Sequence, residues 1–144
     1  MTARQESFTT FEAAEKLKIR IERLRDWINR GYIVPDLEQA KGRGTKGRFS
    51  HSGLCEIKVF DHLLRRSFSR IVAQGMASLV TAHEKEKGTP PKFIWHATIS
   101  EGDEAGGTWG GGDKPFPIKN FGEYADVYIL NIERIRQTVN DLLR

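Results

Sequence analysis

The sequence predicts an α+β protein: helices fill most of the chain up to residue 88, and two strands and a last helix follow. Three observations carry this prediction. Apolar residues recur every three or four positions before residue 88, which is the period of an amphipathic helix. The runs 93–99 and 125–130 are rich in β-branched and aromatic residues, as strands are. A helical stripe returns at 132–143, so we expect two paired strands with the C-terminal helix packed beside them.

We divide the chain into two units at residue 74. Residues 8–74 form the first, and residues 75–144 form a small α+β unit with a glycine-rich loop at 100–124. The length of 144 residues suits one domain, or one small domain with an appendage. Residues 1–74 carry 15 Lys and Arg against 9 Asp and Glu, while residues 75–144 carry 8 against 10. Basic charge therefore gathers in the first unit, which favours nucleic acid as the partner.

The first unit opens with two short helices. Thr9 is suited to cap the first, with Glu12 three positions later as its partner in a capping box. A corner at 18–19 leads into a second helix at about 20–30, which Gly31 is suited to end. The residues expected to be buried are Ala13, Ala14, Leu17, Ile21, Leu24, Trp27 and Ile28.

A glycine-rich basic hairpin at 40–49, which we call the wing, separates these helices from a third. Ser50 or Ser52 caps the third helix, and its apolar positions recur at helical spacing. We expect Gly75 to bend or end this helix before the helical pattern continues to residue 87.

Arginine and lysine gather on the second helix and on the wing. The planar fork of arginine can clasp phosphate oxygens or the edge of guanine, and the wing glycines allow close approach to DNA. We expect Arg23 to project toward base edges and Arg43 to hold the backbone; the alternatives are a solvated helix face and a surface hairpin. The candidate DNA-binding residues are Thr9, Thr10, Lys18, Arg20, Arg23, Arg25, Arg30, Lys41, Arg43, Lys46 and Arg48.

This region resembles the DNA-binding domain of the MerR family of transcription regulators over residues 8–70. The matching positions are Thr9, Glu12, Ala13, Ala14, Leu17, Ile19, the runs 24–27 and 30–35, and Arg48, Phe49 and Ser50. The resemblance implies a winged helix-turn-helix that binds double-stranded DNA sequence-specifically as a dimeric transcription regulator. It places the recognition helix 20–30 in the major groove and the wing 40–49 on the backbone or in the minor groove. Excisionases share this small winged fold, so an architectural or recombination-accessory DNA-binding protein is the alternative.

The second unit leads us to consider two further partners, a second copy of the chain and a small molecule. The stripe of Ile132, Ile135, Val139 and Leu142 leads us to expect a homodimer that uses the C-terminal helix. The alternative is that this helix packs on its own strands and that residues 76–80 join the copies. An unidentified small-molecule effector stays open as well, and it would need a closed pocket lined by aromatic residues. The residues considered for that pocket are Phe93, Trp95, Trp109 and Tyr128.

Metal and catalytic chemistry have little support in the sequence. Cys55 is the single cysteine, and seven residues of helix separate it from His62 by ~10.5 Å, too far for one ion to bridge. We therefore expect no metal and no cofactor. No nucleophile stands in a recognisable motif with a base, and the glycine run around Trp109 lacks phosphate-loop spacing, so we expect no enzyme. A single cysteine and the lack of a long apolar run make a cytoplasmic protein the expectation.

Overall fold

A computed structural model describes residues 7–37, 47–98, 107–115 and 123–144. Over these ranges the chain is mixed α and β, with five helices and two small antiparallel sheets, so the α+β class is confirmed. Within the same ranges, no helix is long and apolar enough to cross a lipid bilayer.

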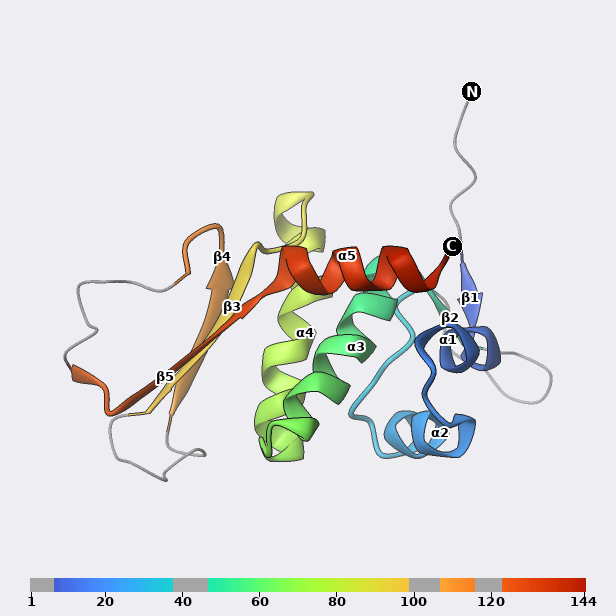
Figure 1. Cartoon of the computed structure of the whole chain (residues 1–144), viewed down its shortest axis with the longest axis horizontal. Coiled ribbons are helices and arrows are strands. Elements are labelled where there is room, and N and C mark those ends of the chain that lie inside the picture. Colours follow the sequence, from blue (N-terminus) through green and yellow to red (C-terminus); the bar gives the residue numbers. More distant parts are fainter. Residues whose placement is uncertain (1–6, 38–46, 99–106, 116–122) are drawn as a thin grey trace.

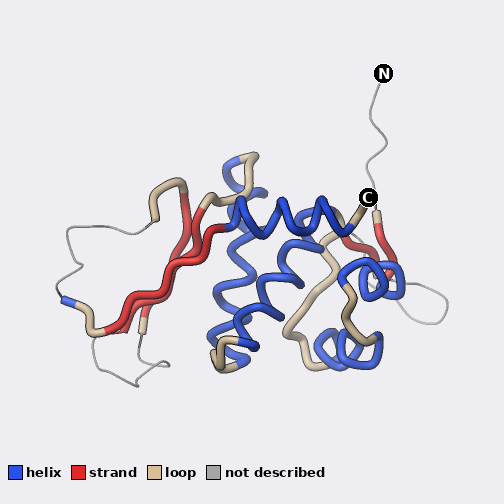
Figure 2. Tube along the Cα trace, in the orientation of Figure 1, coloured by secondary structure: helices blue, strands red, loops and turns tan. Residues whose placement is uncertain are grey.

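A pair of helices forms the centre of the molecule. These are α3 (His51–Arg65) and α4 (Arg70–Lys87). Figure 1 shows a three-stranded sheet on one side of the pair and, on the other side, α1 (Thr10–Leu17) and α2 (Ile21–Asn29). A last helix, α5 (Ile132–Leu142), runs across the pair from the sheet toward α1. The tube in Figure 2 shows that the two sheets lie at opposite ends of this helical body.

The first two helices are α1 (Thr10–Leu17) and α2 (Ile21–Asn29). The expected capping box is present: the Thr9 hydroxyl accepts from the Glu12 amide at 3.2 Å, and the Glu12 carboxylate accepts from the Thr9 amide at 3.2 Å. These bonds to Thr9 lower the pKa of Glu12. Lys18, with φ of 57°, ends α1 in the left-handed conformation, which turns the chain into α2. The expected corner at 18–19 is confirmed.

A short ribbon stands beside the start of α1. Strand β1 (Phe8–Thr9) pairs antiparallel with β2 (Arg48–Phe49), with Phe8 opposite Phe49. The Phe49 side chain is fully buried, so the ribbon is anchored in the core. Residues 40–46 of the expected wing lie outside the described residues.

The expected third helix ends earlier than the sequence indicated. Ser50 caps α3 by accepting from the Gly53 amide at 3.1 Å, but α3 ends at Arg65. Ser67 takes the left-handed conformation with φ of 69°, and Ser69 then caps α4 by accepting from the Val72 amide. The break was missed because a serine gives a much weaker signal for positive φ than a glycine does.

Gly75, expected to bend or end a helix, lies inside α4. Its missing side chain admits the ring of Trp109 from the sheet, since a Cβ at Gly75 would lie 2.6 Å from that ring. The prediction of a bend here is wrong, because this glycine serves close packing between α4 and the sheet.

The sheet has three strands in the order β4-β3-β5, where two were expected. β3 (Phe93–Thr98) and β5 (Asp126–Asn131) fall where the sequence predicted strands. β4 (Thr108–Gly112) comes from the segment expected to be a loop. Glycine weakens a strand in general, but here it makes room: a Cβ at Gly110 would lie 2.7 Å from the Trp95 ring on the neighbouring strand.

The pairing register separates the aromatic rings of the sheet. Trp109 and Tyr128 lie opposite His96 and share its face, on which Trp109 packs against α4. Phe93 and Trp95 alternate with His96 along β3 and therefore lie on the other face. The four aromatic residues considered for an effector pocket are therefore divided between the two faces of the sheet.

The C-terminal stripe is buried within its own chain. Asn131 caps α5 by accepting from the Arg134 amide at 3.1 Å. Ile132 and Val139 are 0% exposed and Ile135 is 9% exposed, in a helix that packs against α1, α3 and β3. The expectation that this stripe is left uncovered for a second copy is wrong, because the described part of the chain forms one continuous core that includes it.

Candidate nucleic-acid interface

The cations of α2 lie on its two flanks. Leu24 and Trp27 are buried, which fixes the rotation of the helix on the core. Successive residues turn about 100° around the axis, so Arg25 lies on the flank facing the start of α1 and Arg23 lies on the flank facing α3. Acidic residues occupy the exposed ridge between the two flanks.

The first flank borders a cleft of about 260 Å³. Arg25 and Asn29 line it from α2, Thr10 and Phe11 line it from α1, and Gly47 lines it from the base of the ribbon. Phe11 is 60% exposed, which is unusual for a large apolar side chain. The cleft brings together two of the sequence-predicted residues, Thr10 and Arg25.

Thr9 also lines this cleft, but its hydroxyl is engaged in the capping box. Its role in the free protein is therefore to hold the start of α1 in place. Phe11 and Asn29 were missing from the sequence-based site. The sequence could have pointed to Phe11, because Phe11 is a large apolar residue that lies outside the buried stripe of α1.

Asp61 of α3 lies at the centre of the second flank and is 2% exposed. Its carboxylate lies 2.9 Å from Nε of Arg65 and 3.9 Å from Nη2 of Arg23. The Arg23 guanidinium also lies 5.1 Å from the centre of the Trp27 ring. Arg23 was expected to project outward, but these contacts draw it back toward α3, with 41% of its side chain still exposed.

More cations surround Asp61. Lys18, Lys58 and Arg65 line a second cleft of about 240 Å³ beside this carboxylate. Burial, followed by the positive charges of Arg66 and Lys58, lowers the pKa of His62 in the same cleft. The flank facing α3 is therefore strongly basic, although a buried carboxylate stands at its centre.

Asp26 lies on the ridge between the flanks and is half-exposed. Nε of Arg30 donates to its Oδ1 at 2.9 Å, and this bond raises the pKa of Arg30. Arg30 is thus a sequence-predicted DNA contact whose charge is paired in the free protein. Arg20 is the N-cap residue of α2 and is exposed.

One wing residue of the predicted site is described. Arg48 is half-buried in β2, and its Nη1 donates to the Ser7 hydroxyl at 3.0 Å. Lys41, Arg43 and Lys46 lie outside the described residues.

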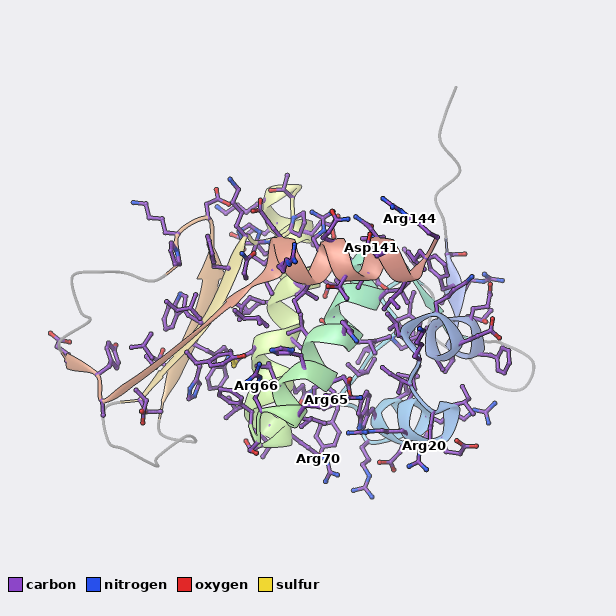
Figure 3. The ribbon with its side chains drawn as sticks, in the orientation of Figure 1. Arg20, Arg65, Arg66, Arg70, Asp141 and Arg144 are labelled. Carbon is purple, nitrogen blue, oxygen red and sulfur yellow. The ribbon has the colours of Figure 1, made fainter. Side chains whose placement is uncertain are left out.

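The corner between α3 and α4 adds arginines that the sequence-based site did not include. Figure 3 shows Arg65, Arg66 and Arg70 in the lower half of the view, where Arg20 also lies. Lys58 belongs with them, because it lines the cleft beside Asp61. These cations were missed because the sequence was interpreted there as one continuous amphipathic helix, and only the break after Arg65 creates a corner.

Metal-ligating residues do not gather in the described part of the chain. Cys55 is buried, and burial raises the pKa of its thiol to about 12. Its Sγ lies 3.8 Å from Nδ1 of His51. Within the four described ranges, no group of three or more His, Cys, Asp and Glu side chains is placed to hold a metal ion.

A comparison of the chain with protein-family models gives no match, and a comparison with curated proteins gives none either.

Proposed function

We propose that this chain binds double-stranded DNA with α2 in the major groove and acts as a sequence-specific transcription regulator. The observation that carries the proposal is the placement of cations on both flanks of one short, exposed helix. A helix in the major groove has a DNA strand on each side. The cations of the flank facing α3 would therefore meet the phosphates of one strand, and Arg25 on the other flank would face base edges.

We assign base recognition to the flank of α2 that faces the start of α1. Arg25 and Asn29 suit it, because arginine pairs bidentately with guanine and asparagine with adenine. Asp26 on the ridge can accept from a cytosine amino group, and its bond to Arg30 reduces its repulsion of phosphate. The flank with Arg23, Lys58 and Arg65 would hold the backbone.

The resemblance to the MerR family supports the same arrangement. It places the wing on the backbone or in the minor groove, which assigns backbone contacts to Lys41, Arg43, Lys46 and Arg48. The excess of basic residues over 1–74 agrees with a polyanionic partner.

The test is an in vitro selection of bound duplexes from a random library, followed by titrations of the selected site at several salt concentrations. With roughly 6–8 phosphates neutralised per dimer, log K should fall against log salt with a slope of about −5 to −7. A flat salt response, or no enriched sequence, would overturn the proposal. Palindromic sites with half-sites one helical turn apart would indicate a homodimer. Tandem clusters of sites bound with DNA bending would instead indicate an architectural protein.

A further inference from the structure

A separate cleft of about 350 Å³ lies between the segment after α2, α3 and α4. Glu56 of α3 lines it and is 7% exposed. The Thr81 hydroxyl of α4 donates to Oε1 of Glu56 at 3.0 Å. No described residue donates a hydrogen bond to the other oxygen, Oε2. Oε2 is also not among the fully buried polar atoms, so it is accessible from the cleft.

The charges around Glu56 leave its negative charge poorly compensated. Burial is the largest effect on this group and raises its pKa to about 7. Asp36, from the segment after α2, adds to the rise, whereas the Thr81 hydroxyl and Lys85 of α4 oppose it. A cation that entered the cleft would relieve both the burial of Glu56 and its repulsion by Asp36.

The walls of the cleft are partly apolar. Val34 and Pro35 line it from the segment after α2, and Ala82 lines it from α4. Val34 is 46% exposed, so apolar surface remains available there. A buried carboxylate next to apolar walls matches a ligand with one charged end and one hydrocarbon end.

We propose that this cleft binds a small organic ammonium ion, which donates to Glu56 and lays its hydrocarbon part against Val34 and Pro35. The site lies apart from the α2 flanks proposed to contact DNA, and this inference does not depend on DNA binding. A divalent metal ion fits less well, because the described residues bring no third ligand of the His, Cys, Asp or Glu type to this place.

The cleft also has a structural link to the first two helices. Nε2 of Gln74 in α4 donates to the carbonyl of Gly31, directly after α2, at 2.9 Å. Asp36 accepts from the Ser50 amide at 2.9 Å at the start of α3. A ligand between these two connections would contact the segment after α2 together with α3 and α4, and would stabilise their relative positions.

The test uses benzylamine, which is protonated at pH 8, where Glu56 is ionised. Amide chemical shifts of the isotope-labelled full chain are followed by NMR during the titration. We expect saturable shifts confined to residues 32–36, the middle of α3 and residues 74–85. Benzyl alcohol has the same ring without the charge, so its affinity should be at least tenfold lower. Glu56→Gln should weaken benzylamine binding at least tenfold.

Glu86→Gln is the matched control, because it makes the same substitution at an exposed carboxylate outside the cleft. It should leave benzylamine affinity unchanged. Equal affinity in Glu56→Gln and the unmodified chain would overturn the proposal, and so would the absence of saturable shifts. Magnesium chloride that produced the same shifts at lower concentration would also overturn it, in favour of a metal site. The NMR spectrum of Glu56→Gln without ligand establishes that the variant is folded.

Discussion

At the scale of single residues, Arg25 and Arg23 are close in sequence but have different surroundings. Arg25 borders the cleft with Thr10 and Asn29. Arg23 lies over Trp27 and is 3.9 Å from the buried carboxylate of Asp61. The sequence led us to expect base recognition by Arg23, and these different surroundings lead us to propose Arg25 for that role instead.

We predict that Arg25→Ala relaxes base preference at one position of the selected site, at a cost of about 1–3 kcal/mol. Arg23→Ala should weaken all duplexes by a similar factor, because a backbone contact carries no base information. Fluorescence anisotropy with the selected duplex and with single-base variants measures both effects. Lys87→Ala is the control, since it removes one positive charge at the far end of α4. If Arg23→Ala relaxed base preference and Arg25→Ala did not, the two roles would be reversed.

The second residue-scale prediction concerns Glu56 and pH. Its pKa is about 7 in the folded chain because the carboxyl is buried, against an ordinary value of 4.5 for a solvated Glu side chain. The folded state therefore binds the proton more tightly than the unfolded state does. The stability that this proton contributes is fully present below pH 4.5 and is lost as the pH rises to about 7.

Glu56→Gln removes this dependence. Relative to the unmodified chain, the variant should gain up to about 3 kcal/mol in free energy of unfolding between pH 5 and pH 8. Urea denaturation at several pH values measures the difference, and Glu86→Gln serves as the exposed control. A constant difference between the Glu56→Gln variant and the unmodified chain across this range would show that Glu56 keeps an ordinary pKa.

At the scale of elements, the packing of α4 against the sheet depends on Gly75. An alanine in a helix interior is favoured over glycine by roughly 0.5–1 kcal/mol. At this position, however, a Cβ would lie 2.6 Å from the Trp109 ring. The steric cost should exceed the gain in helix propensity, because large side chains in a packed core move little.

Gly75→Ala should accordingly lower the free energy of unfolding by about 1–2 kcal/mol. In a Trp109→Ala background the sign should reverse, since the ring is gone and only the helix propensity of alanine remains. A double-mutant cycle by urea denaturation, followed by circular dichroism, measures this coupling. Stabilisation by Gly75→Ala in both backgrounds would show that the ring and the helix are not in close contact.

At the scale of the whole molecule, the described parts of the two expected units share one core. Buried residues of α1, α3, α4, β3 and α5 belong to one hydrophobic cluster. α4 also crosses residue 75 without interruption. The C-terminal helix therefore stabilises the fold of the chain that contains it.

Ile132→Ala should lower the free energy of unfolding by about 2–5 kcal/mol, because Ile132 is 0% exposed at the start of α5. The oligomeric state at equal protein concentration should stay the same. Urea denaturation and light scattering measure the two properties on the same samples. A loss of dimers with unchanged stability of the monomer would place the stripe of α5 in a subunit interface.

Local patterns in the sequence were sufficient to predict the helix starts and strands that have strong capping or composition signals. Thr9 and Ser50 cap helices that they were expected to cap, because a capping side chain bonds within three residues of itself. β3 and β5 fell within one residue of the expected runs, because their β-branched and aromatic content is high. The basic residues of α2 and of the wing that are proposed to meet DNA were also visible in the sequence, whereas Lys58 and Arg65 of α3 were missed.

The tertiary structure decided what depends on residues far apart in the chain. β4 pairs with β3, and Gly110 leaves room there for the Trp95 ring, which no local pattern of residues 108–112 reveals. Asp61 draws Arg23 away from the ridge of α2, although 38 positions separate them in the sequence. The stripe of α5 found its partners on α1 and α3, more than 60 residues earlier. Periodicity shows which face of an element is buried, but the partner that buries it is chosen by packing across the whole chain.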